Sequence, residues 1–335
     1  MDLTDVILAA HRLGDSIIRT PSFVSFAICE LTGLHVVLKA ENEQRSGSFK
    51  FRGALNAMFS LTERQRHAGV IAGSSGNHGR AVALAAQLLG TTAVVVLPKD
   101  APAVKRTAVR GLGAEVVAYD RFLEERDTVV ATIAATQGRN VISSYDEKAV
   151  IAGAGTVALE LLQDAGPLDV LFVPVGGGGL AAGCALANQA GGGRTRVVGV
   201  EPTSADDTMQ SLRAGCRVRI PPPSTIADGL RHQTPGRLTF RLNRRLLAGI
   251  VSVRDVEIAG AMRLLRDAEG LVVEPSGACA LAAVLAGRPS LARGTRVGVV
   301  ISGGNLAGDF NAAGGEKGEA SAPDSGHRPR CSGEV

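Results

Sequence analysis

Aromatic residues are scarce in this chain of 335 residues: they make up 3% of it, and tryptophan is absent. Because the composition is still 45% hydrophobic, the core must be aliphatic, as in a globular protein with two domains or one large one. No run of 18 apolar residues occurs, so no membrane-spanning helix is expected. Residues 1–5 lack the basic and apolar regions of a signal peptide, so we expect a cytoplasmic protein.

An excess of charge of one sign is also missing. The chain has 36 basic and 32 acidic residues and a net charge of +4, and its arginines are spread among the acids. Nucleic-acid binding is therefore not expected. The five cysteines are odd in number and widely spaced, which predicts free thiols rather than a metal or redox motif.

Lysine is rare, since only six of the basic residues are lysines, and one of them stands in an unusual setting. Lys50 lies between Phe49 and Phe51, in a Gly/Ser-rich stretch at the start of a predicted helix. A desolvated lysine amine can lose its proton and attack a carbonyl, whereas arginine stays charged. Lys50 is therefore a candidate for a Schiff base with pyridoxal phosphate, and a solvated surface lysine is the alternative.

Strands and helices alternate along the chain. We predict strands at 35–39, 70–72, 92–97, 115–118, 170–175, 196–200 and 297–301, and helices at 5–13, 48–61, 77–89, 102–112, 122–137, 150–164, 180–190, 255–269 and 277–286. Residues 203–237 are expected to be irregular. This order predicts an α/β fold with a parallel sheet. Ligands of such sheets bind at the carboxyl ends of strands, so the motifs after 70–73, 170–175 and 297–301 are expected to meet at one rim.

Four consecutive glycines follow the strand at 170–175: Gly176, Gly177, Gly178 and Gly179. Bare backbone N–H groups at the start of a helix form a cradle for a phosphate. A flexible turn is the alternative, although four glycines cost backbone entropy. The loop fits neither the P-loop pattern nor the dinucleotide-binding pattern, so ATP hydrolysis and NAD binding are not expected.

Two further motifs follow strands. The first is Ser74, Ser75, Gly76, Asn77 and His78, whose hydroxyl and N–H groups suit a substrate carboxylate, although a helix cap by Ser75 is an equal alternative. Asn77 is a candidate for contact with a cofactor hydroxyl, and His78 is more typical of a structural residue. The second is Ser302, whose hydroxyl suits the ring nitrogen of pyridoxal phosphate, with a plain turn as the alternative.

Oxygen ligands for a cation are grouped in one loop. Glu201, Asp207 and the carbonyl of Ala205 lie within seven residues and suit Mg²⁺ or Ca²⁺. The alternative, which is more common for acidic residues at such spacing in a loop, is that both are solvated and bind no ion.

Taken together, these stretches resemble the serine/threonine dehydratase and serine racemase family, pyridoxal phosphate enzymes of fold type II with the tryptophan synthase β-like fold. The resemblance covers residues 5–309 and rests on motifs that occur in order: Gly47-Ser48-Phe49-Lys50-x-Arg52-Gly53-Ala54, Ser74-Ser75-Gly76-Asn77-His78, Pro174-Val175-Gly176-Gly177-Gly178-Gly179, Gly199-Val200-Glu201-Pro202, Glu274-Pro275 and Ser302-Gly303-Gly304-Asn305.

The resemblance implies a role for each motif. Lys50 would carry the cofactor as a Schiff base, Phe49 would lie against its ring, and Asn77 would bond its 3-hydroxyl. The glycine loop and the Leu180 N–H would hold the phosphate, and Ser302 would face the ring nitrogen. Ser75 matches the opposite-face acid/base of racemases. Glu201, the Ala205 carbonyl and Asp207 match the divalent-metal site of the same group.

The resemblance also implies a division of the chain and a homodimer. Residues 1–60 and 147–312 would form a large cofactor-binding domain, and residues 61–146 a small mobile domain that carries the Ser74–His78 motif. From residue 313 the composition turns to Gly, Glu, Ser, Pro and Arg, which predicts a disordered tail.

Several positions depart from the racemase pattern. Arg80 stands where racemases have a glutamine at a nucleotide effector site, which weighs against activation by ATP. Tyr145 replaces an asparagine and resembles the dehydratases, while His232 replaces a serine near the substrate. Arg126 aligns with an arginine near the racemase substrate pocket. Arg126 and His232 together suggest a substrate with extra negative charge, such as threo-3-hydroxyaspartate.

These observations predict an ammonia-lyase that converts a β-hydroxy amino acid to a 2-keto acid and ammonia. L-Threonine and L-serine are the default substrates, and 3-hydroxyaspartate is the narrower hypothesis. An amino-acid racemase with side dehydratase activity is one alternative. A β-replacement enzyme and an inactive small-molecule sensor on the same fold are the others.

Overall fold

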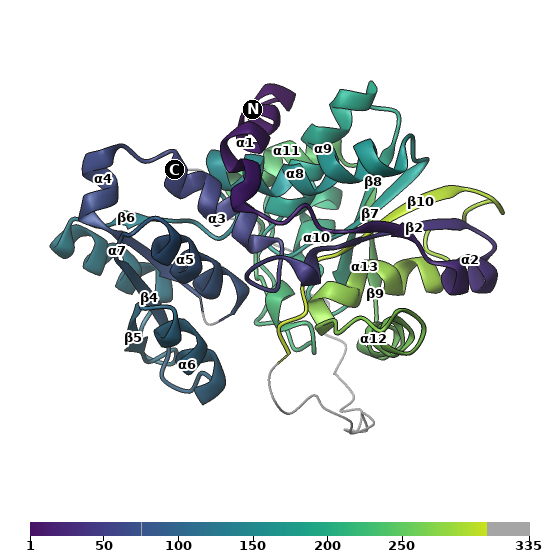
Figure 1. Cartoon of the computed structure of the whole chain (residues 1–335). Coiled ribbons are helices and arrows are strands. Elements are labelled where there is room, and N and C mark those ends of the chain that lie inside the picture. The colour runs from purple at the N-terminus through teal and green to yellow at the C-terminus, as the bar shows by residue number, and fades with distance from the viewer. Residues whose placement is uncertain (75, 307–335) are drawn as a thin grey trace.

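The strands form two separate sheets (Figure 1) in the computed structural model, which describes residues 1–74 and 76–306. The larger sheet has the order β1-β2-β10-β7-β8-β9, with β1 antiparallel to β2 and the other neighbours parallel. Its strands are β1 (Ser22–Val24), β2 (His35–Ala40), β7 (Val170–Pro174), β8 (Arg196–Pro202), β9 (Gly249–Val253) and β10 (Arg296–Ile301). The smaller sheet is parallel in the order β5-β4-β3-β6. Its strands are β3 (Val70–Gly73), β4 (Ala93–Pro98), β5 (Glu115–Tyr119) and β6 (Asn140–Val141).

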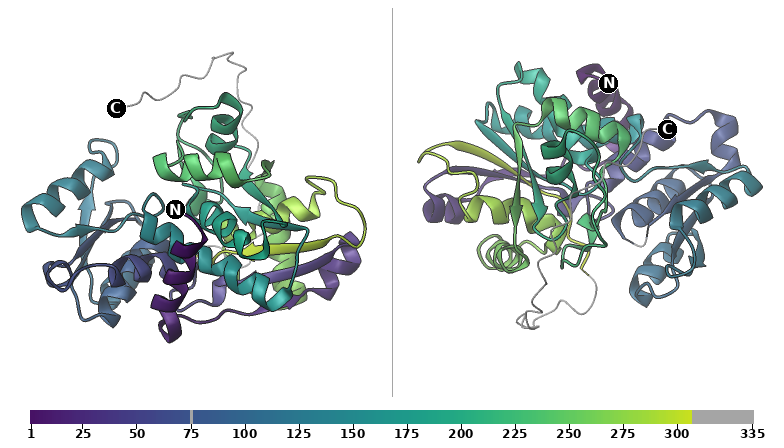
Figure 2. Two further views of the ribbon diagram at one scale, coloured as in Figure 1. Left: turned by 90° about the horizontal axis from the view of Figure 1, so that it is seen from above. Right: turned by 180° about the vertical axis from the view of Figure 1, so that it is seen from behind.

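Helices cover both faces of the larger sheet (Figure 2). One face packs on α2 (Phe26–Thr32), α12 (Asp255–Glu269) and α13 (Pro275–Leu285). The other face packs on α8 (Lys148–Ala165) and α9 (Gly179–Ala187), with α1 (Leu3–Leu13) outside them. The central strands are continuous runs of buried Val, Ile, Leu and Phe, as expected for parallel strands that are covered on both sides.

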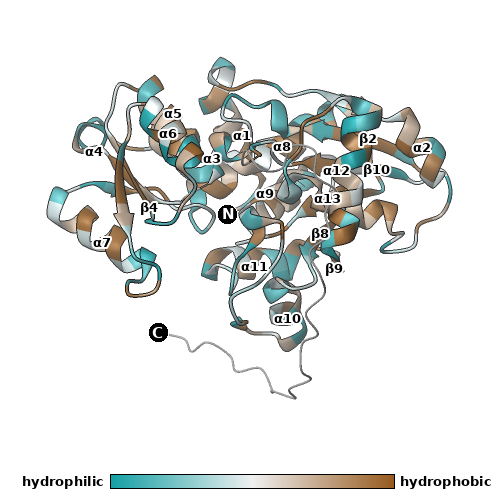
Figure 3. Ribbon diagram, turned by 90° about the horizontal axis from the view of Figure 1, so that it is seen from below, coloured by the Kyte–Doolittle hydropathy of each residue, from teal (hydrophilic) through white to brown (hydrophobic). Residues whose placement is uncertain are grey.

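The smaller sheet is also sandwiched. Helix α5 (Asn77–Leu88) packs on one face, and α7 (Arg126–Gln137) packs on the other through Val130. The apolar β4 lies inside this layer (Figure 3). The remaining helices here are α4 (Glu63–Ala68) and α6 (Ala103–Gly111).

Helix α3 (Lys50–Phe59) joins the two layers, because it packs against both α5 and α8. Glycines allow the close crossing with α8: a Cβ on Gly153 would lie 2.5 Å from the Arg52 carbonyl oxygen. Phe51, Leu55 and Met58 are buried as the helical spacing predicts, but so are the polar Arg52 and Asn56. The first residue of this enclosed helix is Lys50.

Most predicted elements are confirmed, and the differences have physical causes. The stretch 203–237 is not irregular throughout, because α10 (Asp207–Ala214) and the start of α11 (Arg237–Leu246) lie in it. The predicted helix at 122–137 begins only at Arg126, since Asp120 holds the preceding residues in a turn by accepting the N–H of Phe122. The first helix is capped by Asp2, whose Oδ1 accepts the Thr4 N–H at 2.8 Å.

The expectation of a single rim is wrong in one respect. Strand β3 belongs to the smaller sheet, whereas β7 and β10 belong to the larger one. The carboxyl ends of all three nevertheless line one pocket. The strands of the smaller sheet fall within the 61–146 segment, while the domain boundaries themselves stay a prediction. The tail from 313 lies outside the described residues.

Two other expectations concern cysteines and membranes. Cys29, Cys184 and Cys279 are free thiols, whereas Cys216 is disulfide-bonded. The prediction of free thiols is therefore wrong for Cys216, because the spacing of cysteines in a sequence does not show which thiols folding brings together. Among the described residues, no helix combines the length and the apolar character needed to cross a membrane.

Candidate active site

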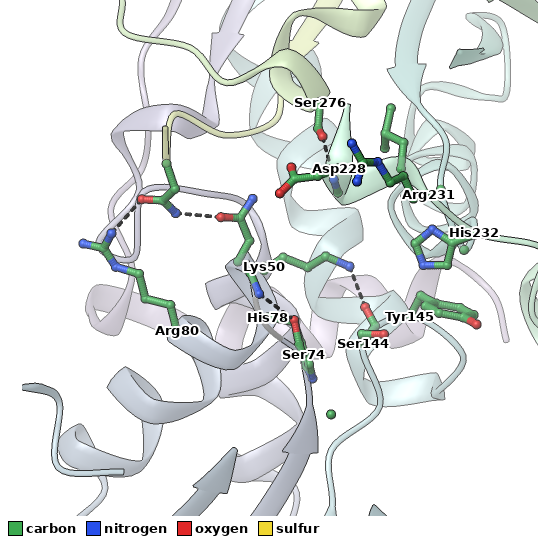
Figure 4. A pocket seen from close by; sticks show the side chains of 18 of the residues that line it. Lys50, Ser74, His78, Arg80, Ser144, Tyr145, Asp228, Arg231, His232 and Ser276 are labelled. Carbon is green, nitrogen blue, oxygen red and sulfur yellow. Dashed lines mark hydrogen bonds between the residues drawn. The ribbon is translucent and has the colours of Figure 1, made fainter. Parts of the chain in front are cut away.

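A pocket of about 840 Å³ lies where the two sheets face each other. Its walls come from the carboxyl ends of β3, β7 and β10, from the first residue of α3 and from the segment 228–234. Figure 4 shows Lys50 near the middle of this pocket, with His78 and Ser74 on one side and His232 and Tyr145 on the other. The motifs that contain Lys50, Asn77, the four glycines and Ser302 thus share one cavity.

Lys50 is the candidate nucleophile and base. Its Nζ donates to the Ser144 carbonyl at 2.7 Å and lies 5.0 Å from the centroid of the Phe49 ring. Burial lowers the pKa of Lys50 from 10.5 to about 8, although the nearby Glu274 carboxyl opposes the shift. The amine is therefore uncharged far more often near neutral pH than an ordinary lysine, which suits attack on a carbonyl.

The four glycines present a row of backbone donors. Within the described residues, the N–H groups of Gly176, Gly177 and Gly178 donate to no acceptor, and Gly179 and Leu180 begin α9, where N–H groups lack helical partners. The N-cap Gly178 has φ of +90°, which favours glycine. The Tyr145 side chain lies so close to the loop that a Cβ on Gly177 would overlap its ring. This row of free donors at a helix start fits a phosphate.

Helix α11, which was not predicted from the sequence, orients the loop. Thr239 Oγ1 donates to the Gly177 carbonyl at 2.7 Å, and Asn243 Nδ2 donates to the Gly178 carbonyl at 3.2 Å. The helix is capped by Asp146, which accepts the N–H groups of residues 237–239 at 2.9–3.0 Å. Because the carbonyls are held from behind, the N–H groups are left for a ligand. Nothing in the local sequence indicates a cap 91 residues away.

Asn77 lies at the start of α5 with both ends of its amide bonded. Its Nδ2 donates to Glu274 Oε1 at 2.5 Å, and its Oδ1 accepts from Asn305 Nδ2 at 2.7 Å. Burial raises the pKa of Glu274 to about 8, so this carboxyl is largely protonated at neutral pH. Glu274 and Asn305 belong to motifs of the family resemblance, but their contacts with Asn77 could not be predicted because Asn77 is far away in the sequence.

The other residues of the Ser74–His78 motif are also in the pocket, and Ser75 lies outside the described residues. Ser74 Oγ accepts the Gly76 N–H at 3.2 Å. His78 is buried, and its Nε2 lies 2.9 Å from the Ile142 carbonyl, so Nε2 carries the proton. Burial, assisted by the charge of Lys50, lowers the pKa of His78 to about 3 and keeps the ring neutral.

On the opposite wall, His232 and Tyr145 form one aromatic contact. Their ring centroids lie 5.0 Å apart at an interplanar angle of 85°. Burial, followed by the charges of Lys50 and Arg126, lowers the pKa of His232 to about 3. Arg126 begins α7 and lines the pocket, with Nε donating to Asp127 Oδ1 at 2.8 Å. Arg126 and His232 are the two residues that suggested a substrate with extra negative charge. Of the two, only Arg126 is a cation, because the His232 ring is neutral.

Ser302 closes the floor of the pocket at the end of β10. It is 4% exposed, and its Oγ makes one long hydrogen bond, 3.4 Å to the Ser276 carbonyl. The Ser302 carbonyl accepts the Phe49 N–H at 3.1 Å, which ties the end of β10 to the start of α3. The hydroxyl can exchange this long bond for one to a ring nitrogen.

Glu201 and Asp207 lie outside the pocket, at the end of β8 and the start of α10. Both carboxylates are buried; Glu201 accepts the N–H groups of Thr208 and Met209, whereas both Asp207 oxygens lack a partner in the described structure. Burial raises the pKa of Asp207 to about 8, and burial together with Asp207 raises the pKa of Glu201. Two adjacent buried carboxyls, of which Asp207 has both oxygens unpaired, fit a cation. No group of three or more His, Cys, Asp or Glu suited to a metal occurs in the described chain.

Comparison with known proteins agrees with this geometry. The profile of the family described as "Pyridoxal-phosphate dependent enzyme" matches residues 13–303. The chain is 47% identical over 302 residues to an L-threo-3-hydroxyaspartate ammonia-lyase of a Pseudomonas species, covering 90% of this chain and 94% of that protein. It is 43% identical to the Saccharomyces cerevisiae protein of the same name, covering 90% and 92%.

A solved structure of maize serine racemase superimposes with a TM-score of 0.88 at 38% identity, covering 92% of this chain and 94% of that one. The predicted family and its fold type II architecture are thereby confirmed. Pyridoxal phosphate, the cofactor predicted to bind Lys50, is also the cofactor named in the description of the matched family. This chain belongs to the family of pyridoxal-phosphate dependent enzymes.

Proposed function

We propose that this enzyme is an ammonia-lyase for β-hydroxy amino acids and that it prefers L-threo-3-hydroxyaspartate to L-threonine and L-serine. The observation that carries the proposal is Lys50, a lysine with a pKa of about 8 in a pocket beside unpaired backbone donors. The two relatives at 47% and 43% identity support the substrate.

Residues of this chain offer a partner for each part of the cofactor. Lys50 would hold it covalently, the Phe49 ring would lie against it, and Ser302 would bond its ring nitrogen. The N–H groups of Gly176–Gly179 and Leu180 would bind the phosphate. Asn77 has a second Nδ2 hydrogen beyond the one given to Glu274, and this hydrogen would go to the ring hydroxyl.

When bound, pyridoxal phosphate supplies an electron sink for the negative charge that deprotonation leaves on the α-carbon of an amino acid. The amine of Lys50 would be the base that takes that α-proton at Nζ. The hydroxyl then leaves the β-carbon, so that water is lost. A water molecule is consumed again when the amino group is released as ammonia. The net reaction therefore converts 3-hydroxyaspartate to oxaloacetate and ammonia without gain or loss of water.

Substrate recognition follows from the pocket walls. The N–H groups at the start of α5, in the Ser74–His78 motif, would bind the α-carboxylate that all three substrates share. Arg126 would bind the second carboxylate that only hydroxyaspartate has. His232 is neutral and contributes a hydrogen-bonding ring rather than a second charge.

A substrate panel tests this proposal. We would measure keto-acid release from L-threo-3-hydroxyaspartate, L-threonine and L-serine with wild type and Arg126→Ala. The variant should lose about 100-fold in kcat/KM for hydroxyaspartate, the effect of one charge-assisted contact, and less than threefold for threonine. Arg121→Ala is the matched control: Arg121 lines the same pocket but donates both Nε and Nη2 to Asp100, whereas Arg126 donates only Nε to Asp127 in the described structure. Equal losses on both substrates would refute the role of Arg126.

Racemisation is the second candidate, because the maize serine racemase structure is similar over nearly the whole chain. A racemase needs an acid on the opposite face of the substrate from Lys50, and Ser75 is the predicted group. Chiral analysis of unreacted L-serine separates the two activities. If the chain is mainly a racemase, D-serine will form faster than pyruvate, and Ser75→Ala will abolish the first product selectively.

We also propose a cation, Mg²⁺ or Ca²⁺, at Glu201, Asp207 and the Ala205 carbonyl. Its charge would remove the repulsion of two buried carboxylates. Mg²⁺ or Ca²⁺ should therefore raise the melting temperature of the wild type, and a chelator should reverse the rise. Asp207→Asn should melt at the same temperature with and without the ions. A melting temperature that no divalent ion changes would contradict the site.

Finally, we propose that the enzyme is a cytoplasmic homodimer. Phe26 and Leu31 on the short helix α2 are 82% and 66% exposed, which leaves apolar surface to cover. Light scattering of the purified holoenzyme would give the mass, and a monomer would refute this part.

A further inference from the structure

Four polar side chains form a continuous chain of hydrogen bonds along one wall of the pocket. Arg80 Nη1 donates to Asn305 Oδ1 at 2.7 Å, Asn305 Nδ2 donates to Asn77 Oδ1 at 2.7 Å, and Asn77 Nδ2 donates to Glu274 Oε1 at 2.5 Å. Figure 4 shows Arg80 at the outer end of this chain. The four residues come from α5, from the segment after β10 and from the N-cap of α13.

The direction of every bond follows from the two groups that flank Asn305. A guanidinium has donors and no acceptor, so the Asn305 oxygen must face Arg80. A backbone carbonyl has only acceptors, and the Ser46 carbonyl lies 2.9 Å from Asn305 Nδ2. Turning the Asn305 amide over would set donor against donor and acceptor against acceptor. Its Nδ2 must therefore point to Asn77, and the Asn77 oxygen must accept.

Packing holds Asn305 in this position. Gly47 has φ of +75°, and a Cβ there would come within 2.9 Å of Asn305 Cγ, so the amide sits against bare backbone. In the described chain, no carboxylate pairs with Arg80. The arginine is thus available to hold the amide oxygen.

We infer that Asn305, held between Arg80 and the Ser46 carbonyl, is a positioning residue that turns the N–H group of Asn77, rather than its carbonyl, toward the ring oxygen of the cofactor. The inference rests on the cofactor contact proposed for Asn77. It adds that this contact depends on an amide whose orientation is fixed from the opposite end of the network.

Two variants at position 305 distinguish a positioning role from a packing role, because the two roles predict opposite orders for the loss of cofactor affinity. Asn305→Asp keeps the shape and adds an ion pair with Arg80, but it has no donor for Asn77 or for the Ser46 carbonyl. The Asn77 amide then turns over to donate to the new carboxylate, and its oxygen faces the cofactor. Asn305→Ala merely leaves Asn77 free. Positioning therefore predicts that the aspartate variant is the more damaged, whereas packing predicts that the alanine variant is.

The readout is the equilibrium affinity of the apoenzyme for pyridoxal phosphate, with the pH titration of the visible absorption band as a second measure. We expect Asn305→Asp to weaken binding at least tenfold, the effect of exchanging one hydrogen bond for a repulsive contact, and Asn305→Ala about threefold. Arg80→Met should fall near the alanine variant, and Arg80→Lys, which keeps a donor-only group, should recover part of the loss. Urea unfolding of each apoenzyme confirms that the variants fold.

Asn56→Asp is the matched control. Asn56 also accepts from an arginine, Arg12, at 2.6 Å and donates to a backbone carbonyl, that of Ala149, at 2.6 Å. It lies away from the pocket lining, so its variant should keep the wild-type cofactor affinity.

The outcomes separate the two claims. Wild-type affinity and spectrum in Asn305→Asp, or a larger loss in Asn305→Ala, would overturn the positioning role. Asn77→Ala distinguishes the underlying proposal: if that variant also binds and absorbs like wild type, Asn77 does not contact the cofactor. A changed Asn77→Ala beside an unchanged Asn305→Asp would refute the positioning role alone.

Discussion

Replacing Arg52 by methionine should be among the most destabilising single changes in this protein. The Arg52 side chain is fully buried two residues after Lys50. It donates to Glu41 Oε1 and Oε2 at 2.7 and 2.8 Å and to Glu160 Oε1 and Oε2 at 2.6 and 2.8 Å. Lys39 Nζ completes the cluster with a 2.7 Å bond to Glu160. Two cations and two anions therefore balance, and they link β2, α3 and α8.

The magnitude follows from the charge that remains. Without Arg52, two buried carboxylates share one ammonium, and an uncompensated buried charge costs ~3–5 kcal/mol. Methionine fills most of the volume, so little cavity cost is added. Neutralising one carboxylate restores the balance of Lys39 with Glu160. Arg52→Met with Glu41→Gln should therefore be more stable than Arg52→Met alone by about 1–2 kcal/mol, only part of that cost, because the polar groups that Arg52 bonded still lack its donors.

Urea unfolding of the apoenzyme measures these differences from the shift in midpoint at constant slope. Arg19→Met is the control, because Arg19 pairs with Asp164 at 2.5 Å on the surface with 53% of its side chain exposed, and such a pair contributes at most about 1 kcal/mol. A loss of less than 1 kcal/mol in Arg52→Met, or no recovery in the double variant, would show that this network does not support α3.

The remaining predictions concern the glycine loop and acid stability. Gly177→Ala should weaken cofactor binding at least tenfold, because its Cβ overlaps the Tyr145 ring, and Tyr145→Ala should restore part of the affinity by making room; no restoration would argue against this clash. His78 has a pKa of about 3 in the folded chain and 6.5 in the unfolded one, so its contribution to stability is complete above pH 6.5 and is lost as the pH falls toward 3. Between pH 7 and pH 5 it should account for about 2 kcal/mol of lost stability in urea unfolding, and His78→Gln should lose less by that amount; identical losses would contradict the burial of a neutral ring.

Local signals allowed the sequence to predict the cofactor-binding elements. The glycine loop follows an apolar strand and precedes a helix, so its place at a carboxyl strand end follows from neighbouring residues alone. Lys50 could be singled out because lysine is rare and because its neighbours are small or aromatic. The same reasoning places Ser302 after β10 and Asn77 at the start of α5.

Long-range contacts could not be predicted, because local signals do not show which distant residues meet in the fold. Helix α11 depends on a cap from Asp146, and Asn77 depends on Glu274, 197 residues later. A strand carries no local mark of the sheet that it joins, so the separation of β3 from β7 and β10 could not be foreseen. The burial of Arg52 is likewise invisible until α8 brings Glu160 to it.

The most direct test of the whole account is the chemical identity of the cofactor attachment. The holoenzyme would be reduced with borohydride, digested, and mapped by mass spectrometry for the lysine that carries the pyridoxyl group. The account predicts the label on the peptide with Lys50 and on no other of the six lysines, and neither label nor visible band in Lys50→Ala. A label on another lysine, or an active Lys50→Ala enzyme that retains the band, would contradict it.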